Sequence, residues 1–159
     1  MGDFQQLAAA WSEWGPIGGL SGVRVSTECP DCLVLFFSDD YEFHLKKNYD
    51  WWVVDTVDDR GSRSPGLAQL SNFSLAEKYL IWNWITAARS DLASGALGSD
   101  LYKLGYAPGV MVSEMDFGRD EVCADGECAI LMTGTSTIFS HIMTRSLDEI
   151  MAVAKGGQQ

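Results

Sequence analysis

The stretch SLAEKYLIWNWITAAR, residues 74–89, predicts the helix around which the rest of the chain is organised. Ser74 and Glu77 have the spacing of a capping box, in which each side chain accepts a hydrogen bond from the backbone N–H of the other residue. Apolar side chains then recur around most of the helix: Leu75, Tyr79, Leu80, Trp82, Trp84, Ile85 and Ala88. A helix with so wide an apolar surface must be covered on more than one side. We therefore predict a central core helix.

Length, composition and charge bound the class of protein. The 159 residues suit a single domain over residues 1–159, and 47% hydrophobic with 21% charged residues is typical of a globular protein. A net charge of −11 argues against nucleic acid and anionic membranes and favours a basic partner. No apolar run approaches the ~20 residues that span a bilayer, and residues 1–14 lack the basic start of a secretory signal. We therefore expect a cytoplasmic protein.

The remaining periodicity predicts an α+β fold, a single domain in which helices pack on one face of an antiparallel β-sheet. Short β-type runs occupy residues 23–26, 33–38, 41–46, 51–56, 110–117 and 128–132. In the third run, Tyr41, Phe43 and Leu45 alternate with polar residues, which places His44 on a solvent-exposed face. Residues 58–65 are expected to form a polar loop.

Helices are expected at both ends of the chain. The first covers residues 4–14, with Asp3 as its cap, and is ended by Gly15 and Pro16. Two more cover residues 135–144 and 147–154. Ser146 and Glu149 repeat the capping box before the last of these.

The four cysteines leave several interpretations open. Cys29 and Cys32 have the spacing of a zinc knuckle, and four thiolates with Cys123 and Cys128 could hold a structural zinc ion. Cys123 and Cys128 would instead face each other, close enough for a disulfide, if the turn at residues 125–126 is tight. A redox pair is a further alternative. Ordinary thiols are the favoured interpretation, so we expect neither a metal nor a cofactor.

The sequence shows no catalytic constellation. His44 is expected on a polar strand face, and His141 follows Ser140 within the C-terminal helical segment. A histidine next to a serine in sequence is not positioned as its general base. We expect no catalytic residue, and therefore a protein that is not an enzyme.

Several stretches, taken in order from residue 33 onward, carry a resemblance to a known family. They are LVLFF (33–37), YEFHL (41–45), WWVVD (51–55) running into DDRGSRS (58–64), SLAEKYLIWNW (74–84), MVSEMDF (111–117) and SHIMTRSLDEIMAV (140–153). Their order and spacing resemble the actinobacterial immunity proteins that include the immunity factor for tuberculosis necrotizing toxin. The four cysteines are not part of this pattern.

The resemblance implies a non-enzymatic antitoxin. Such a protein binds a cognate protein toxin, a secreted NAD⁺ glycohydrolase, as a 1:1 heterodimer in the cytosol of the producing cell and occludes the toxin's active site. Two alternatives stay open: a zinc- or thiol-dependent enzyme using Cys29, Cys32, Cys123 and Cys128, and a secretion chaperone or adaptor.

The expected partner-binding segment is the polar loop after the aromatic strand. Asp58, Asp59, Arg60 and Arg63 mix both charges on a loop that is attached to a rigid element. Recognition residues are concentrated on such loops, and arginine is enriched among interface anchors. We predict that the two aspartates meet basic groups of the toxin and that an arginine pairs with a toxin carboxylate.

Overall fold

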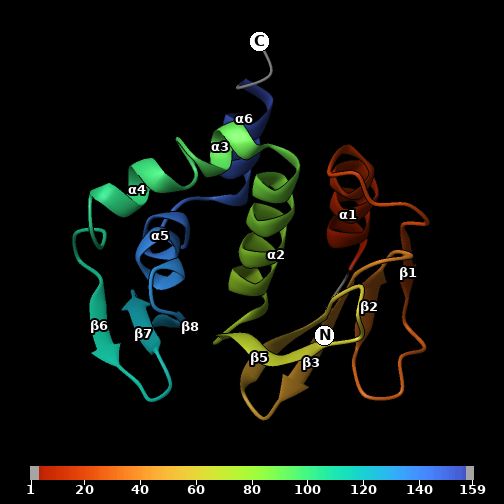
Figure 1. Ribbon diagram of the computed structural model, residues 1–159. Helices are drawn as coiled ribbons and strands as arrows, with labels where there is room; N and C mark the ends of the chain where they lie inside the picture. Colours follow the sequence, from red (N-terminus) through yellow and green to blue (C-terminus); the bar gives the residue numbers. More distant parts are fainter. Residues whose placement is uncertain (1–3, 157–159) are drawn as a thin grey trace.

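Helix α2 (Phe73–Ala88) lies against the middle of an eight-stranded antiparallel sheet in the computed structural model, which describes residues 4–156 (Figure 1). The strands, in chain order, are β1 (Arg24–Ser26), β2 (Val34–Phe37), β3 (Glu42–Asn48), β4 (Trp51–Val57), β5 (Arg63–Leu70), β6 (Met111–Glu114), β7 (Arg119–Ala124) and β8 (Glu127–Met132). Their order across the sheet is β1-β2-β3-β4-β5-β8-β7-β6. The predicted α+β fold with an antiparallel sheet is therefore confirmed.

The other helices surround α2 on the same side of the sheet (Figure 1). They are α1 (Gln5–Ile17), α3 (Ser90–Ala93), α4 (Ser99–Lys103), α5 (Thr135–Ile142) and α6 (Leu147–Gly156). Trp84 packs toward α1 and β2, with ring centroids 5.0 Å from Trp11 and 5.1 Å from Phe36. Trp82 packs toward α5, 5.9 Å from the ring of Phe139. The predicted central helix is confirmed. Within the described range, no helix combines the length and apolar character that crossing a bilayer requires.

The start of α2 differs from the predicted capping box. Asn72 is the N-cap, with an extended backbone, and its Oδ1 accepts from the N–H of Leu75 at 2.8 Å. Ser74 lies inside the first turn, so the prediction that it caps the helix was wrong. Nδ2 of Asn72 also donates to Oε2 of Glu127 at 2.7 Å, a contact with β8 that a reading of the helix segment alone does not reveal. At α6 the box is confirmed, because Ser146 and Glu149 exchange hydrogen bonds of 2.7 and 3.1 Å.

We expect Asn72→Ala to lower the free energy of unfolding by about 1 kcal/mol, the usual cost of losing an N-cap. Ser74→Ala is the matched control and should change it by less than about 0.5 kcal/mol, since Ser74 is exposed and does not cap the helix. Urea denaturation of both variants measures the difference. An equal effect of the two substitutions would contradict this assignment of the cap.

Two strands were missed by the sequence analysis. Strand β5 begins within the segment expected to be a polar loop, and its pairing with β4 shifts register between Val54 and Thr56. Pro65 and Gly66 lie at this β-bulge, and such residues hide the alternation that identifies a strand. In β7, Asp120 occupies a buried position, where it accepts hydrogen bonds from the hydroxyls of Tyr106 and Ser136. A charged residue on the core side conceals that strand in the same way.

Helix α1 is longer than predicted. It continues through Gly15 and Pro16 to Ile17, because the N–H of Gly18 still donates to the carbonyl of Trp14 at 3.0 Å. The predicted cap, Asp3, lies outside the described residues.

Candidate functional site on the open face of the sheet

A charged residue lies in the middle of the aromatic strand β4. Trp52, Val54 and Thr56 of this strand contact the helix side, so Val53 and Asp55 lie on the opposite face, here called the open face. The side chain of Asp55 is only 1% exposed. A buried carboxylate needs partners for its charge, which makes its surroundings the first candidate for a functional site.

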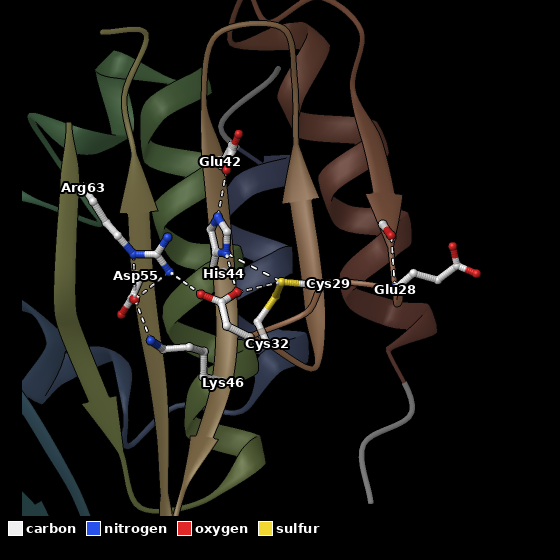
Figure 2. Close-up of a disulfide and its surroundings, with 10 residues drawn as sticks. Glu28, Cys29, Cys32, Glu42, His44, Lys46, Asp55 and Arg63 are labelled. Atoms are coloured by element: carbon white, nitrogen blue, oxygen red, sulfur yellow. Dashed lines mark hydrogen bonds and ion pairs between the residues drawn. A yellow bond between two sulfur atoms is a disulfide. The ribbon is translucent and has the colours of Figure 1, made fainter. Parts of the chain in front are cut away.

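Three groups from the neighbouring strands hold Asp55. Lys46 of β3 donates from Nζ at 2.8 Å, and Arg63 of β5 donates from Nη2 at 2.9 Å and from Nε at 3.2 Å. The backbone N–H of Gly66 donates at 2.8 Å. Gly66 has φ +60° at the bulge, a conformation that glycine adopts without strain. These four residues are here called the Asp55 network, and Figure 2 shows three of them, Lys46, Asp55 and Arg63.

The pKa of Asp55 reflects two opposing effects. Burial raises the pKa, since it disfavours the charged form. The hydrogen bonds from Gly66, Lys46 and Arg63 outweigh burial and hold the pKa below its ordinary value. Asp55 is therefore an ionised anchor that fixes two cations on the open face.

A second polar cluster lies beside this network, on β3 (Figure 2). His44 Nε2 lies 2.7 Å from Oε1 of Glu42, and its Nδ1 lies 3.8 Å from Sγ of Cys29 and 3.8 Å from Oδ1 of Asp31. His44 does face away from the helices, but it is only 7% exposed. The expectation of an exposed histidine was wrong because the loop between β1 and β2, residues 27–33, covers it.

Arg63 joins the two clusters. Its Nη2 lies 2.9 Å from Asp55 and 3.4 Å from Oδ2 of Asp31 in the 27–33 loop. A hollow of about 530 Å³ lies beside these groups, and its lining includes Asp31, Lys46 and Asp55. The open face thus carries a pre-formed, ion-paired surface with room for a side chain of a partner.

The structure divides the predicted binding residues into two groups. Asp59 and Arg60 are exposed at the turn between β4 and β5. Asp58 is partly buried, and its Oδ1 accepts from the N–H groups of Arg60 and Ser62, both at 2.9 Å, so this carboxylate holds the turn. Arg63 is not in the loop but in β5, directed toward Asp55.

Sequence reasoning missed the residues that organise Arg63. Asp55 carried a signal, since it is a carboxylate at the end of the apolar run WWVV, where an unpaired charge is costly. Its partners Lys46 and Gly66 come from different strands, and their proximity depends on strand register. No pattern within one segment reveals them.

The cysteines form two disulfides, Cys29–Cys32 and Cys123–Cys128. The favoured prediction of ordinary thiols was therefore wrong, and the alternative of a disulfide across the hairpin is confirmed, because Cys123 and Cys128 are directly paired in β7 and β8. A site with four thiolates is also excluded. Several strands separate the two disulfides in the sheet, at about 4.8 Å per strand, which is far beyond the reach of one ion.

The fold and the site define a class: an α+β protein with helices on one face of an antiparallel sheet and an ion-paired polar surface on the other. A solved structure of this fold is Rv3902c from M. tuberculosis, with a TM-score of 0.67 and 17% sequence identity over 90% of this chain and 87% of that chain. At this identity the similarity shows the shared fold alone. No protein-family model matches the chain, and no curated protein matches it in sequence.

Proposed function

We propose that the protein is an immunity protein that binds a secreted NAD⁺ glycohydrolase toxin in the cytoplasm of the producing cell, occludes its active site, and has no catalytic activity of its own. One observation carries the proposal. The stretches that resemble the immunity family lie in β2, β3, β4, α2, β6, α5 and α6, and the fold similarity to Rv3902c covers 90% of the chain. The resemblance in sequence is what supports the immunity family, and the fold shared with Rv3902c is compatible with it.

The open face supports an inhibitory role through its rigidity. Arg63 and Lys46 are already ordered by Asp55, so binding through them would not have to immobilise two long side chains. Ordering such side chains costs about 0.5–1.5 kcal/mol each on association. The net charge of −11 adds long-range attraction toward a basic surface, which raises the association rate. Fast association suits an inhibitor that must reach its toxin before turnover.

The direct test is an NAD⁺-hydrolysis assay. A secreted NAD⁺ glycohydrolase toxin of the producing organism is mixed with increasing amounts of this protein, and hydrolysis is followed with a fluorogenic NAD⁺ analogue. We expect inhibition to be complete at a 1:1 ratio. Binding without inhibition would support the chaperone or adaptor alternative instead. Absence of both binding and inhibition would refute the proposal.

The exposed turn between β4 and β5 provides a sharper test of the surface. We expect Asp59→Lys to slow association with the toxin several-fold at low salt, with a smaller effect at high salt, because exposed charges are screened over about 8–10 Å. Asp50→Lys is the matched control, since Asp50 is exposed at the turn between β3 and β4, at the opposite end of these strands.

The choice of Asp59 avoids a structural artefact. Asp58 holds the turn, and substitution of Arg63 would disturb Asp55, so a loss of binding in either variant would not report on contact alone. Association rates of the Asp59 and Asp50 variants, measured at two salt concentrations, show whether the turn between β4 and β5 contributes to toxin binding. Equal rates for the Asp59 and Asp50 variants would place the interface away from this turn.

A further inference from the structure

Four side chains of the kinds that bind zinc converge where the 27–33 loop crosses β3 (Figure 2). One ligand atom from each of Cys29, Asp31, Cys32 and His44 lies within 4.8 Å of all the others. Thiolate, imidazole and carboxylate are the ligands that zinc takes in four-coordinate sites. His44 is buried and Asp31 is exposed, so an ion here would lie at the surface of the open face.

Two of the observed separations match those of a tetrahedral site. Zinc bonds of about 2.0–2.3 Å place neighbouring ligand atoms roughly 3.4–3.8 Å apart. Nδ1 of His44 lies 3.8 Å from Sγ of Cys29 and 3.8 Å from Oδ1 of Asp31, and that oxygen lies 3.1 Å from the same sulfur. The two sulfur atoms must separate, because they are bonded to each other, and the 3.1 Å between Sγ of Cys29 and Oδ1 of Asp31 must widen slightly.

The surrounding groups orient these ligands. A carboxylate only accepts hydrogen bonds, so Glu42 takes the N–H of His44 Nε2 at 2.7 Å, and the lone pair of neutral His44 is then on Nδ1, toward the sulfur atoms. A histidine that binds a metal usually donates its other N–H to a carboxylate in this way. Arg63 binds Oδ2 of Asp31, which leaves Oδ1 for the ion.

From this geometry we propose that reduction of the Cys29–Cys32 disulfide converts the 27–33 loop into a zinc site with Cys29, Asp31, Cys32 and His44 as ligands. A dithiol reductant gives two electrons and two protons, so the S–S bond breaks, two thiols form, and the reductant becomes a disulfide. Zn²⁺ then displaces both thiol protons, forms two Zn–S bonds, and accepts lone pairs from Nδ1 of His44 and Oδ1 of Asp31.

The two states exclude each other, and each of them fastens the loop over His44. In a reducing compartment the disulfide does not persist, and zinc then replaces it as the crosslink. The second cysteine pair has fewer metal-ligand atoms around it. Among the described residues, Glu121, Cys123 and Cys128 supply three ligand atoms at their hairpin, one fewer than a closed tetrahedral site needs.

The test is metal titration of the full chain after reduction with a phosphine under anaerobic conditions. We expect one Co²⁺ per chain, with a thiolate-to-cobalt charge-transfer band in the near ultraviolet and tetrahedral visible bands, and displacement of Co²⁺ by Zn²⁺. The oxidised protein should show neither band. Glu42→Gln should weaken zinc binding by about 10-fold or more, the usual effect of losing a carboxylate behind a ligating histidine.

Cysteine variants provide the matched controls. Cys123→Ser with Cys128→Ser should keep the single cobalt site, whereas Cys29→Ser with Cys32→Ser should abolish it. Far-ultraviolet circular dichroism shows whether each variant is folded, and His44→Gln serves if the Cys29 and Cys32 variant is not. The proposal is overturned if reduced protein binds no cobalt, if the oxidised protein binds it equally, or if loss of Cys29 and Cys32 or of His44 leaves the spectrum unchanged.

Discussion

Truncation of Trp84 to alanine is expected to lower the free energy of unfolding by about 4–5 kcal/mol, the upper part of the range for large aromatic residues in a core. Trp84 is 3% exposed and contacts the rings of Trp11, Phe36 and Phe43. It also lines a cavity of about 310 Å³ between α1, α2 and the sheet, and the truncation would enlarge this cavity. Urea denaturation measures the change. A loss below about 1 kcal/mol would contradict the central position of α2.

Phenylalanine at the two tryptophan positions gives a matched comparison. The indole N–H of Trp82 donates to the carbonyl of Leu97 at 2.8 Å, whereas that of Trp84 is buried without a hydrogen-bond partner among the described residues. Trp82→Phe leaves a buried carbonyl unsatisfied, which costs about 1–3 kcal/mol. Trp84→Phe removes a donor that makes no hydrogen bond. We therefore expect Trp82→Phe to be the more destabilising of the two, and the reverse order would contradict this packing.

The second large effect is expected at Asp55. Asp55→Ala removes hydrogen bonds from Lys46, Arg63 and Gly66, and we expect a loss of about 2–3 kcal/mol. This loss of unfolding free energy is smaller than that for a fully buried ion pair, because Lys46 and Arg63 are partly exposed and remain hydrated. Asp39→Ala is the control, because its pair with Arg24 is exposed and should contribute less than about 1 kcal/mol.

Acid titration gives an independent readout of Asp55. Its native pKa is lower than its unfolded value of about 4, so its ionisation stabilises the fold above that pH. The contribution is lost as pH falls through the lowered native pKa. Stability curves between pH 7 and pH 2 should therefore be less steep below pH 4 in Asp55→Asn than in the parent. Identical slopes would show that Asp55 is not held as an ion pair.

Local patterns were sufficient where an element's neighbours in sequence decide its structure. The apolar surface of α2 and the capping box at Ser146 and Glu149 both depend on residues within a few positions of one another, and both are confirmed. The turn that brings Cys123 and Cys128 opposite each other is also local, and the disulfide alternative there was correct.

Contacts between distant segments decided the features that the local patterns did not predict. Asn72 rather than Ser74 caps α2, and Asn72 is also bound to Glu127 of β8. His44 is buried because the 27–33 loop crosses its strand. Arg63 looked like a loop residue and is instead a strand residue that is paired with Asp55 across the sheet.

The sequence by itself therefore determined the fold class and the core helix, since hydrophobic periodicity is a property of each segment. The resemblance to the immunity family rests instead on the order and spacing of whole stretches. Only the tertiary structure decided the polar surface of the open face. Asp55, Lys46, Arg63 and Gly66 come from three strands, and the β-bulge and strand register place them within hydrogen-bonding distance. Residues that are buried and charged find their partners across strands, and that pairing depends on the register of the whole sheet.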